Sequence, residues 1–344
     1  MLLRQGRGNL HKFLIILLSL MVGCSTGHQF SQGRAFKLKA VSWSELKGWQ
    51  NDDLLEALPA LRRSCQKPVQ MFERFCDGLS NISSESALRS HIEKTLEPYQ
   101  VQSYGKTTGK ITGYYEAELT GTRRRRSATQ YPIYGLPTGY TRGKTYPTRN
   151  AIFEKSLNAP IIAWADNEID LFIMHVQGSG RLITPDGEVI HLGFAGSNGR
   201  KFSGLGAIMM SMGIDQENAR SMPNIRTWAL ANPQKAHELM MKNDRFIFFK
   251  EIHGETPIGS AGIPLTPERS LAVDTDYIPM HTPIWLETTT PDGWPLKQLM
   301  VAQDTGAAIK GGIRADFFWG YGENAFNTAG HMNQSGRYYL LLPR

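Results

Sequence analysis

The stretch VAQDTGAAIKGGIRADFFWG, residues 301–320, is the part of the chain that least resembles ordinary scaffold. An apolar strand over 299–302 leads into Asp304, and glycines and small residues separate this aspartate from Asp316 and an aromatic strand over 317–319. Glycines between short strands allow tight turns or a close approach of the backbone to a ligand. We therefore expect both aspartates at strand edges, where a rigid sheet holds a carboxyl group over a groove.

Two interpretations of these aspartates stay open at this point. In the first, both carboxyl groups take part in chemistry. In the second, Asp304 forms a turn before Thr-Gly, and Asp316 pairs with Arg314 or Lys310.

Several ordered motifs are shared with one known family. The segments are AQDTGAAIKG (302–311), RADF (314–317), LAVDTDYIP (271–279), TGYYE (112–116), YPIY (131–134) and FIMHVQGSG (172–180). Together they resemble the lytic murein transglycosylases of type A, from about residue 108 to the end of the chain. The resemblance implies a double-psi β-barrel with three aspartates, Asp274, Asp304 and Asp316, and an enzyme that cleaves peptidoglycan glycan strands without a cofactor or metal.

The implied reaction sets the role of each aspartate. Ordinary glycosidases need two carboxylates, whereas in this reaction the C6 hydroxyl of muramic acid attacks C1 and forms a 1,6-anhydro sugar. One carboxyl group can then act first as acid and next as base. By motif match this is Asp316, whose pKa we expect the aromatic residues 317–319 to raise. Asp304 supports the site and Asp274 is structural, with Lys310 and Arg314 turned outward or paired with those two aspartates.

Candidate substrate-binding residues lie in the same motifs. Gln177, Gly178 and Ser179 offer amide, hydroxyl and backbone donors to N-acetyl groups, although a tight β-turn is the alternative. Tyr114 and Tyr115 alternate across a strand, so one belongs to the core and the other can stack on a sugar. Of the two tyrosines we assign substrate binding to Tyr115, and we assign it to Lys310 as well.

The start of the chain has the pattern of a bacterial secretion signal. A basic head precedes a short apolar run over 13–22, too short for a permanent membrane helix. The sequence MVGCS resembles a lipobox that would make Cys24 the lipid-bearing first residue, with ordinary cleavage to a soluble periplasmic protein as the alternative. Ser25 is not an inner-membrane retention signal, so we expect an outer-membrane lipoprotein on the periplasmic face. An oxidising periplasm permits a bridge between Cys65 and Cys76.

Charge argues against nucleic acid as a partner. Without the three signal-peptide cations, 35 Lys and Arg stand against 31 Asp and Glu, a net charge of +4. The one dense basic cluster, residues 123–126, is typical of a solvated hairpin tip. The expected partners are peptidoglycan strands, outer-membrane lipid and complexes of wall synthesis and hydrolysis.

The mature chain is mainly β with a helical N-terminal part. Apolar spacing predicts helices between 42 and 96, including one capped by Ser83 or Ser84 with Leu88, Ile92 and Leu96 on one face. Strands are expected at 101–104, 110–115, 131–134, 172–176, 188–194 and 246–250, with 188–194 as the hairpin partner of 172–176, and helices at 204–213 and 215–242. His175 would then be a core histidine within a strand.

We divide the chain into five parts. They are a lipoprotein signal peptide (1–23), a tether (24–40), an N-terminal helical part of the barrel domain (41–112), an inserted β-rich domain (113–250) and a C-terminal barrel part (251–344). A groove between the two domains is expected. Two other functions compete with the transglycosylase: an endoglucanase-like hydrolase on the same barrel and a non-catalytic glycan-binding module.

Overall fold

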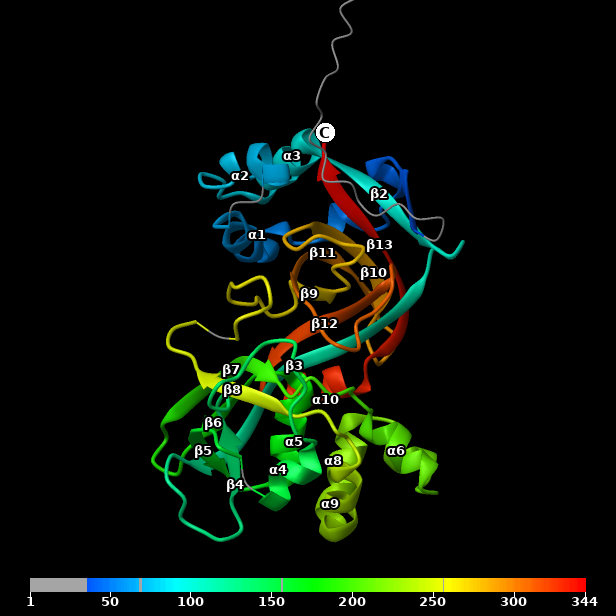
Figure 1. Cartoon of the computed structure of the whole chain (residues 1–344). Helices are drawn as coiled ribbons and strands as arrows, with labels where there is room; N and C mark the ends of the chain where they lie inside the picture. The colour runs from blue at the N-terminus through cyan, green and yellow to red at the C-terminus, as the bar shows by residue number, and fades with distance from the viewer. Residues whose placement is uncertain (1–35, 68–69, 156, 256) are drawn as a thin grey trace, which may run out of the picture.

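The computed structural model describes residues 36–67, 70–155, 157–255 and 257–344 (Figure 1). Cys24 and the signal peptide lie outside these ranges. The expected tether is too long by five residues, because Phe36–Ala40 forms strand β1 and pairs antiparallel with β2 (Leu96–Ser103). Phe36 is buried in the core, which explains why this polar segment folds. Among the described residues no helix is both long and apolar enough to cross a bilayer.

Six strands of the large sheet pair in a closed ring. Their order is β13, β10, β11, β9, β12 and β3, and β3 pairs again with β13. The strands are β3 (Gly109–Thr122), β9 (Ser270–Val273), β10 (Pro283–Thr289), β11 (Pro295–Asp304), β12 (Arg314–Tyr321) and β13 (Asn333–Pro343). Ring strands such as β9 and β10 are almost wholly buried, as expected of apolar runs covered on both faces.

The predicted N-terminal helices pack on this ring. They are α1 (Leu58–Cys65), α2 (Glu73–Asp77) and α3 (Glu85–Thr95), with short 3-10 turns between β1 and α2. Ser84 caps α3 by accepting a hydrogen bond from the backbone N–H of Ala87, as predicted. Leu96 is buried, but it is the first residue of β2 rather than part of the helix.

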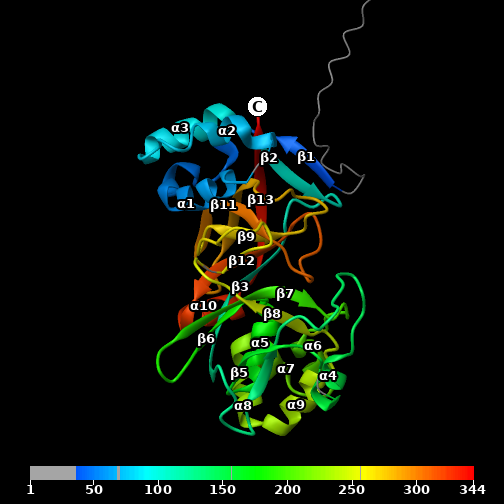
Figure 2. The same cartoon turned by 60° about the vertical axis from the view of Figure 1, so that its left-hand side comes forward.

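The second part of the molecule is built on the far half of β3. It adds strands β4 (Tyr131–Tyr134), β5 (Ile161–Ala165), β6 (Gly180–Ile183), β7 (Val189–Ser197) and β8 (Ile247–Glu251). Its helices are α4 (Arg149–Lys155), α5 (Glu168–Gln177), α6 (Leu205–Ser211), α7 (Gln216–Ala219), α8 (Met222–Ala231) and α9 (Pro233–Met241), and α10 (Gly322–His331) joins them from the C-terminal segment. In Figures 1 and 2, β3 runs from the part that holds the ring into this second part.

One predicted strand is wrong. Residues 172–176 belong to helix α5, which Asn167 caps by accepting from the backbone N–H groups of Ile169 and Asp170. The helix is buried on nearly all sides, so its continuous apolar run carries no period that separates helix from strand. The hairpin partner of β7 is therefore β6, joined through the predicted Pro-Asp-Gly turn.

The basic cluster 123–126 is not a hairpin tip, because β3 and β4 both pair with β5. Arg123 forms ion pairs with Glu188 and Glu251 at 2.5 and 2.8 Å. The cluster is thus partly neutralised by acidic partners from β8 and the turn before β7.

Two hydrophobic cores meet on β3. The first contains Ile111, the N-terminal helices and the ring strands, and the second begins at Tyr115 and contains α5. Between these two residues β3 carries Thr112 and Tyr114. The strand therefore brings polar side chains to the junction of the two cores.

Candidate active site

The ring brings the three predicted aspartates together. Asp304 ends β11, Asp274 directly follows β9, and Asp316 lies near the start of β12. Ala272 on β9 is in register with both Asp304 and Asp316. The two carboxylates therefore lie on either side of one small, buried residue, with backbones about 10 Å apart, two strand spacings.

Asp316 is held by two donors. The Thr112 hydroxyl on β3 donates to Asp316 Oδ1, and Arg314 Nη1 lies 3.4 Å from the same oxygen. The Asp316 side chain is 19% exposed, so a substrate can reach it. The expectation that Arg314 turns outward or pairs with another aspartate is wrong, because residues two apart on a strand share one face.

Asp304 is enclosed by backbone and hydroxyl donors. Its Oδ1 accepts from Ser260 N at 2.9 Å, Ser260 Oγ at 2.7 Å and Thr305 N at 2.9 Å. Burial raises the pKa of Asp304, and these hydrogen bonds oppose the rise without cancelling it. The turn containing Ser260 is far away in sequence, and nothing in the sequence analysis identified it.

Tyr114, not Tyr115, faces the aspartates. Burial raises the pKa of Tyr114 well above its ordinary value, and the nearby charges of Asp304 and Asp316 raise it further. Tyr115 is only 7% exposed and packs on Phe326 in the second core, so its predicted stacking on a sugar is incorrect. The sequence predicted that Tyr114 and Tyr115 point to opposite faces of strand β3. Which of these faces is covered depends on the helices of the second part.

Asp274 and Lys310 form an ion pair. Asp274 accepts from Lys310 Nζ at 3.0 Å, from Gly311 N at 2.8 Å and from Asp276 N at 3.3 Å. Although burial alone would raise its pKa, the hydrogen bonds from Gly311 and Lys310 leave the pKa below its usual value. Of the arrangements expected for Lys310, the structure shows the pair with Asp274, whereas substrate binding by Lys310 and a structural role for Asp274 stay predictions.

The segment 177–179 lies at the C-terminal end of helix α5. It is therefore neither the end of a strand nor the tight β-turn expected from the sequence. Gly178 caps the helix with φ of 85°, a left-handed conformation that favours glycine. Gln177 Oε1 accepts from the backbone N–H of Tyr115 at 3.2 Å. The segment therefore lies beside β3, one residue from Tyr114, and its role toward substrate stays a prediction.

A buried polar network lies behind Asp304. Gln303 Nε2 donates to Ala60 O and Ser64 Oγ, both at 2.8 Å, and Ser270 Oγ donates to Gln303 Oε1 at 2.6 Å. The network ties β11 and β9 to helix α1. Gln303 belongs to the motif 302–311, but its hydrogen-bond partners are more than 30 residues away in sequence, so these contacts follow only from the fold.

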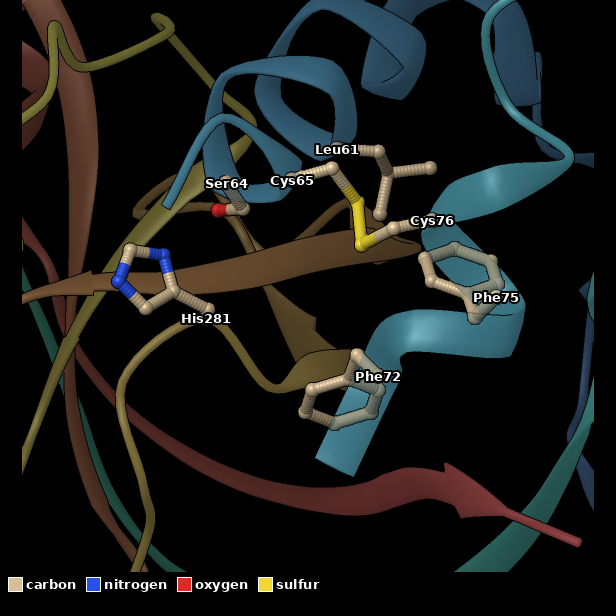
Figure 3. A pocket seen from close by; sticks show the side chains of 7 residues that line it. All are labelled: Leu61, Ser64, Cys65, Phe72, Phe75, Cys76 and His281. Carbon is tan, nitrogen blue, oxygen red and sulfur yellow. A yellow bond between two sulfur atoms is a disulfide. The ribbon is translucent and has the colours of Figure 1, made fainter. Parts of the chain in front are cut away.

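A disulfide fixes the end of the same helix. Cys65 and Cys76 are bonded with Cα atoms 5.4 Å apart. Figure 3 shows them beside a small, mainly apolar cavity together with Ser64 and His281. This cavity contains none of the three aspartates, so it is not the reaction site. No group of three or more metal-ligating side chains occurs among the described residues.

Two family models match the chain: the MltA specific insert domain over residues 110–250 and the 3D domain over residues 269–342. The membrane-bound lytic murein transglycosylase A of Vibrio cholerae is 33% identical over 274 residues, which cover 75% of this chain and 73% of the relative.

Two solved structures share the fold. MltA from Neisseria gonorrhoeae, in its monoclinic form, has a TM-score of 0.81 and 31% identity over 90% of this chain and 94% of its own. MltA from Escherichia coli with bound chitohexaose has a TM-score of 0.69 and 26% identity, covering 92% and 98%. The fold is accordingly MltA-like, a mainly β arrangement of mixed sheet and helices.

Proposed function

Because the chain belongs to the membrane-bound lytic murein transglycosylase A family, we propose that Asp316 is the single acid and base of its reaction. The chain is a peptidoglycan lytic transglycosylase, a lyase that cleaves the glycan strands of the cell wall. The observation that supports the role of Asp316 is its position on the ring, across Ala272 from Asp304 and within reach of Thr112.

In the proposed first step, Asp316 donates its proton to the oxygen that links N-acetylmuramic acid to N-acetylglucosamine. The bond from C1 to that oxygen breaks, and the oxygen leaves with the proton. Positive charge develops at C1, and the charge of Asp304 stabilises it. The Asp316 carboxylate that is left accepts hydrogen bonds from the Thr112 hydroxyl and from Arg314 Nη1.

In the second step, the C6 hydroxyl of the same muramic residue attacks C1. Asp316 takes the hydroxyl proton, so the carboxyl group returns to its starting state and a 1,6-anhydro ring closes. The hydroxyl competes well with water because it is part of the bound sugar and reaches C1 at a high effective concentration.

The proposal extends to the architecture around this chemistry. The closed ring of six strands is the double-psi β-barrel, the segment 113–250 is an insertion into the barrel domain, and the glycan lies in a groove at their junction along β3. The bound chitohexaose of the Escherichia coli structure supports a glycan-binding surface in this fold. Gln177 and Ser179 supply hydrogen bonds to N-acetyl groups there.

The proposed location is the outer membrane, on the periplasmic face. A membrane-bound enzyme of the cell envelope follows from the family. Lipid attachment at Cys24 is the finer proposal, and association with wall-synthesis complexes follows from the same location.

Replacement of Asp316 tests the mechanism directly. Asp316→Asn keeps the side-chain volume but removes the titratable proton, so cleavage of purified peptidoglycan should fall at least 10²–10⁴-fold, the usual contribution of one acid–base group. Glycan binding should survive. The matched control is Asp292→Asn, an exposed aspartate in the turn between β10 and β11, which should leave cleavage unchanged.

The products separate the competing functions. Mass spectrometry of wild-type digests should show anhydro-muropeptides. Reducing muramic ends as the main product would instead support a hydrolase, and intact strands would support a non-catalytic glycan-binding module. Substantial turnover by Asp316→Asn would overturn the assignment of that residue.

A further inference from the structure

Tyr321 is an exposed aromatic residue at the end of the strand that carries Asp316. Its side chain is 56% exposed, although it lies between β12 and helix α10. Its ring packs on the guanidinium of Arg181, which lies 3.8 Å from the ring centroid. The guanidinium lies over one face of the ring, and more than half of the Tyr321 surface is open to solvent.

A β-bulge turns Tyr321 toward the side of the sheet on which Asp316 lies. Asp316 and Phe318 pair with Thr112 and Tyr114 on β3, and after a register shift Tyr321 pairs with Glu116. The three β3 partners alternate along the strand and share one face, so their β12 partners share that face too. In a regular strand of the same sequence, residues 316, 318 and 320 would share one face and Tyr321 would point to the opposite face.

A glycine makes this bulge possible. Gly320 has φ of 94°, a backbone conformation that other residues rarely adopt, and it directly precedes Tyr321. Their β3 partners, Thr112 and Glu116, are four residues apart, so residues 316 and 321 are about 13 Å apart along the strand at roughly 3.3 Å per residue. A ligand on Tyr321 would therefore be a sugar other than the one cut at Asp316.

The buried carboxylate of Glu116 holds Arg181, on which the Tyr321 ring packs. Glu116 is 1% exposed and accepts from Arg181 Nε at 3.1 Å and Nη2 at 2.9 Å. The bonds hold the planar guanidinium in one orientation, and a fixed guanidinium orients the ring stacked upon it. A rigid aromatic ring binds at a low cost in conformational entropy, which is the property a sugar platform needs.

We propose that Tyr321 is a platform on which a pyranose ring of the peptidoglycan strand stacks, away from the cleaved bond, and that Arg181 and Glu116 are its positioning residues. This inference rests on the proposed function. The ligand is a glycan because the C–H face of a pyranose matches an open aromatic ring, and because the platform shares its face of the sheet with Asp316.

Binding can be measured without cleavage in the Asp316→Asn background, with chitohexaose as the probe in titration calorimetry. Adding Tyr321→Ala should weaken binding about two- to tenfold, the range for one aromatic contact. Tyr321→Phe keeps the ring and should bind like the parent, whereas Trp294→Ala, which removes an exposed ring in the turn between β10 and β11, should change nothing.

The positioning role needs a readout separate from stability. Arg181→Leu should also weaken binding, but the double variant Arg181→Leu, Tyr321→Ala should bind no more weakly than Tyr321→Ala alone, since both changes remove one platform. With wild-type Asp316, Tyr321→Ala should lower kcat/KM on glycan strands mainly by raising KM.

Two outcomes would overturn the inference. One is a folded Tyr321→Ala protein that binds chitohexaose as the parent does, and the other is a Tyr321→Phe protein that binds as weakly as Tyr321→Ala. If the wild type still forms anhydro products in either case, only the platform fails. Absence of anhydro products from the wild type would mean that the proposed function itself is wrong.

Discussion

Asp304 and Asp274 lie close together on neighbouring strands, yet their surroundings shift their pKa values in opposite directions. Burial dominates at Asp304 and raises its pKa, whereas hydrogen bonds from Gly311 and Lys310 outweigh burial at Asp274 and lower its pKa. Enclosed carboxyl groups with raised pKa values are typical of catalytic sites. The opposite directions of the two shifts agree with the proposed roles, Asp304 as a supporting catalytic aspartate and Asp274 as a structural one.

The first residue-level prediction concerns Asp304. Because its folded pKa is raised, its contribution to stability is full below the unfolded pKa of 3.8 and is lost as pH rises through the folded pKa. Asp304→Asn keeps Oδ1 for its three donors and avoids the buried charge. At pH 7 the Asp304→Asn variant should have a free energy of unfolding about 0.5–2 kcal/mol higher than the wild type. Its turnover should be lower but still measurable.

Asp274→Asn is the matched variant, and we expect it to change the free energy of unfolding in the opposite direction. The lowered pKa means that Asp274 stabilises the fold above pH 3.8 and that this contribution is lost as pH falls through the folded pKa. The variant should lose about 1.5–3 kcal/mol of unfolding free energy at pH 7, the value of hydrogen bonds to a charged group. Urea unfolding of both variants from pH 3 to 8 checks the two predictions. They would be contradicted if the free energy of unfolding depended on pH in the same way in both variants.

At the scale of elements, helix α1 connects the disulfide to the reaction site. Ala60 and Ser64 on α1 bind Gln303, the neighbour of Asp304, and Cys65 ends the helix. The disulfide crosses from α1 to α2 and closes a loop with a sequence separation of 11. It therefore holds the layer of helices on which the back of the site rests.

Removing the disulfide should cost stability. Cys65→Ser, Cys76→Ser should lower the free energy of unfolding by about 2–3 kcal/mol, because the unfolded chain loses a short covalent loop. The wild type unfolded in urea with reductant should match the double variant without it. As a control, Ser84→Ala should cost about 1 kcal/mol in both conditions through the α3 cap. Reductant with no effect on the wild type would contradict this prediction.

Helix α5 shows why an apolar run can mislead. Its core-facing side chains come from almost every position, so neither a period of two nor a period of 3.6 appears in the sequence. The deciding signals were Asn167, which caps its start, and Gly178, which ends it. Both were visible in the sequence, where Asn before a run and Gly after it mark a helix.

At the scale of the whole molecule, the candidate site and the proposed lipid anchor at Cys24 lie in separate parts of the chain. The described residues begin at β1, which already packs on the main core, so a lipid at Cys24 would be tied to the fold through few intervening residues. Such an anchor would keep the enzyme near the membrane surface.

The anchoring prediction concerns Cys24→Ala. Without the thiol no diacylglyceryl group can be attached, so activity should move from the membrane fraction to the soluble periplasmic fraction. Mass spectrometry of the purified wild type should find a lipid-modified N-terminal cysteine, with Ser25→Ala as a variant that keeps the lipid. A wild-type protein that starts elsewhere and carries no fatty acid would refute the lipoprotein.

The sequence by itself determined the strand that leads into Asp304, the strand that follows Asp316, a serine cap at the start of α3, and, through the shared family motifs, the three aspartates as a group. These features depend on local pattern: short apolar and aromatic runs, a serine before a helix, and dense motifs. Pairing of Lys310 with Asp274 was one of the arrangements expected from the sequence, whereas the hydrogen bond from Gly311 follows only from the fold.

Only the tertiary structure decided which groups surround each carboxylate. Ser260, Thr112 and Ala272 come from distant segments, and closure of the ring brings them beside Asp304 and Asp316. The choice of Tyr114 over Tyr115 and the exposure of Tyr321 depend on which face the second core covers. Local pattern sets the two faces of a strand, but burial of one face is a property of the packed molecule.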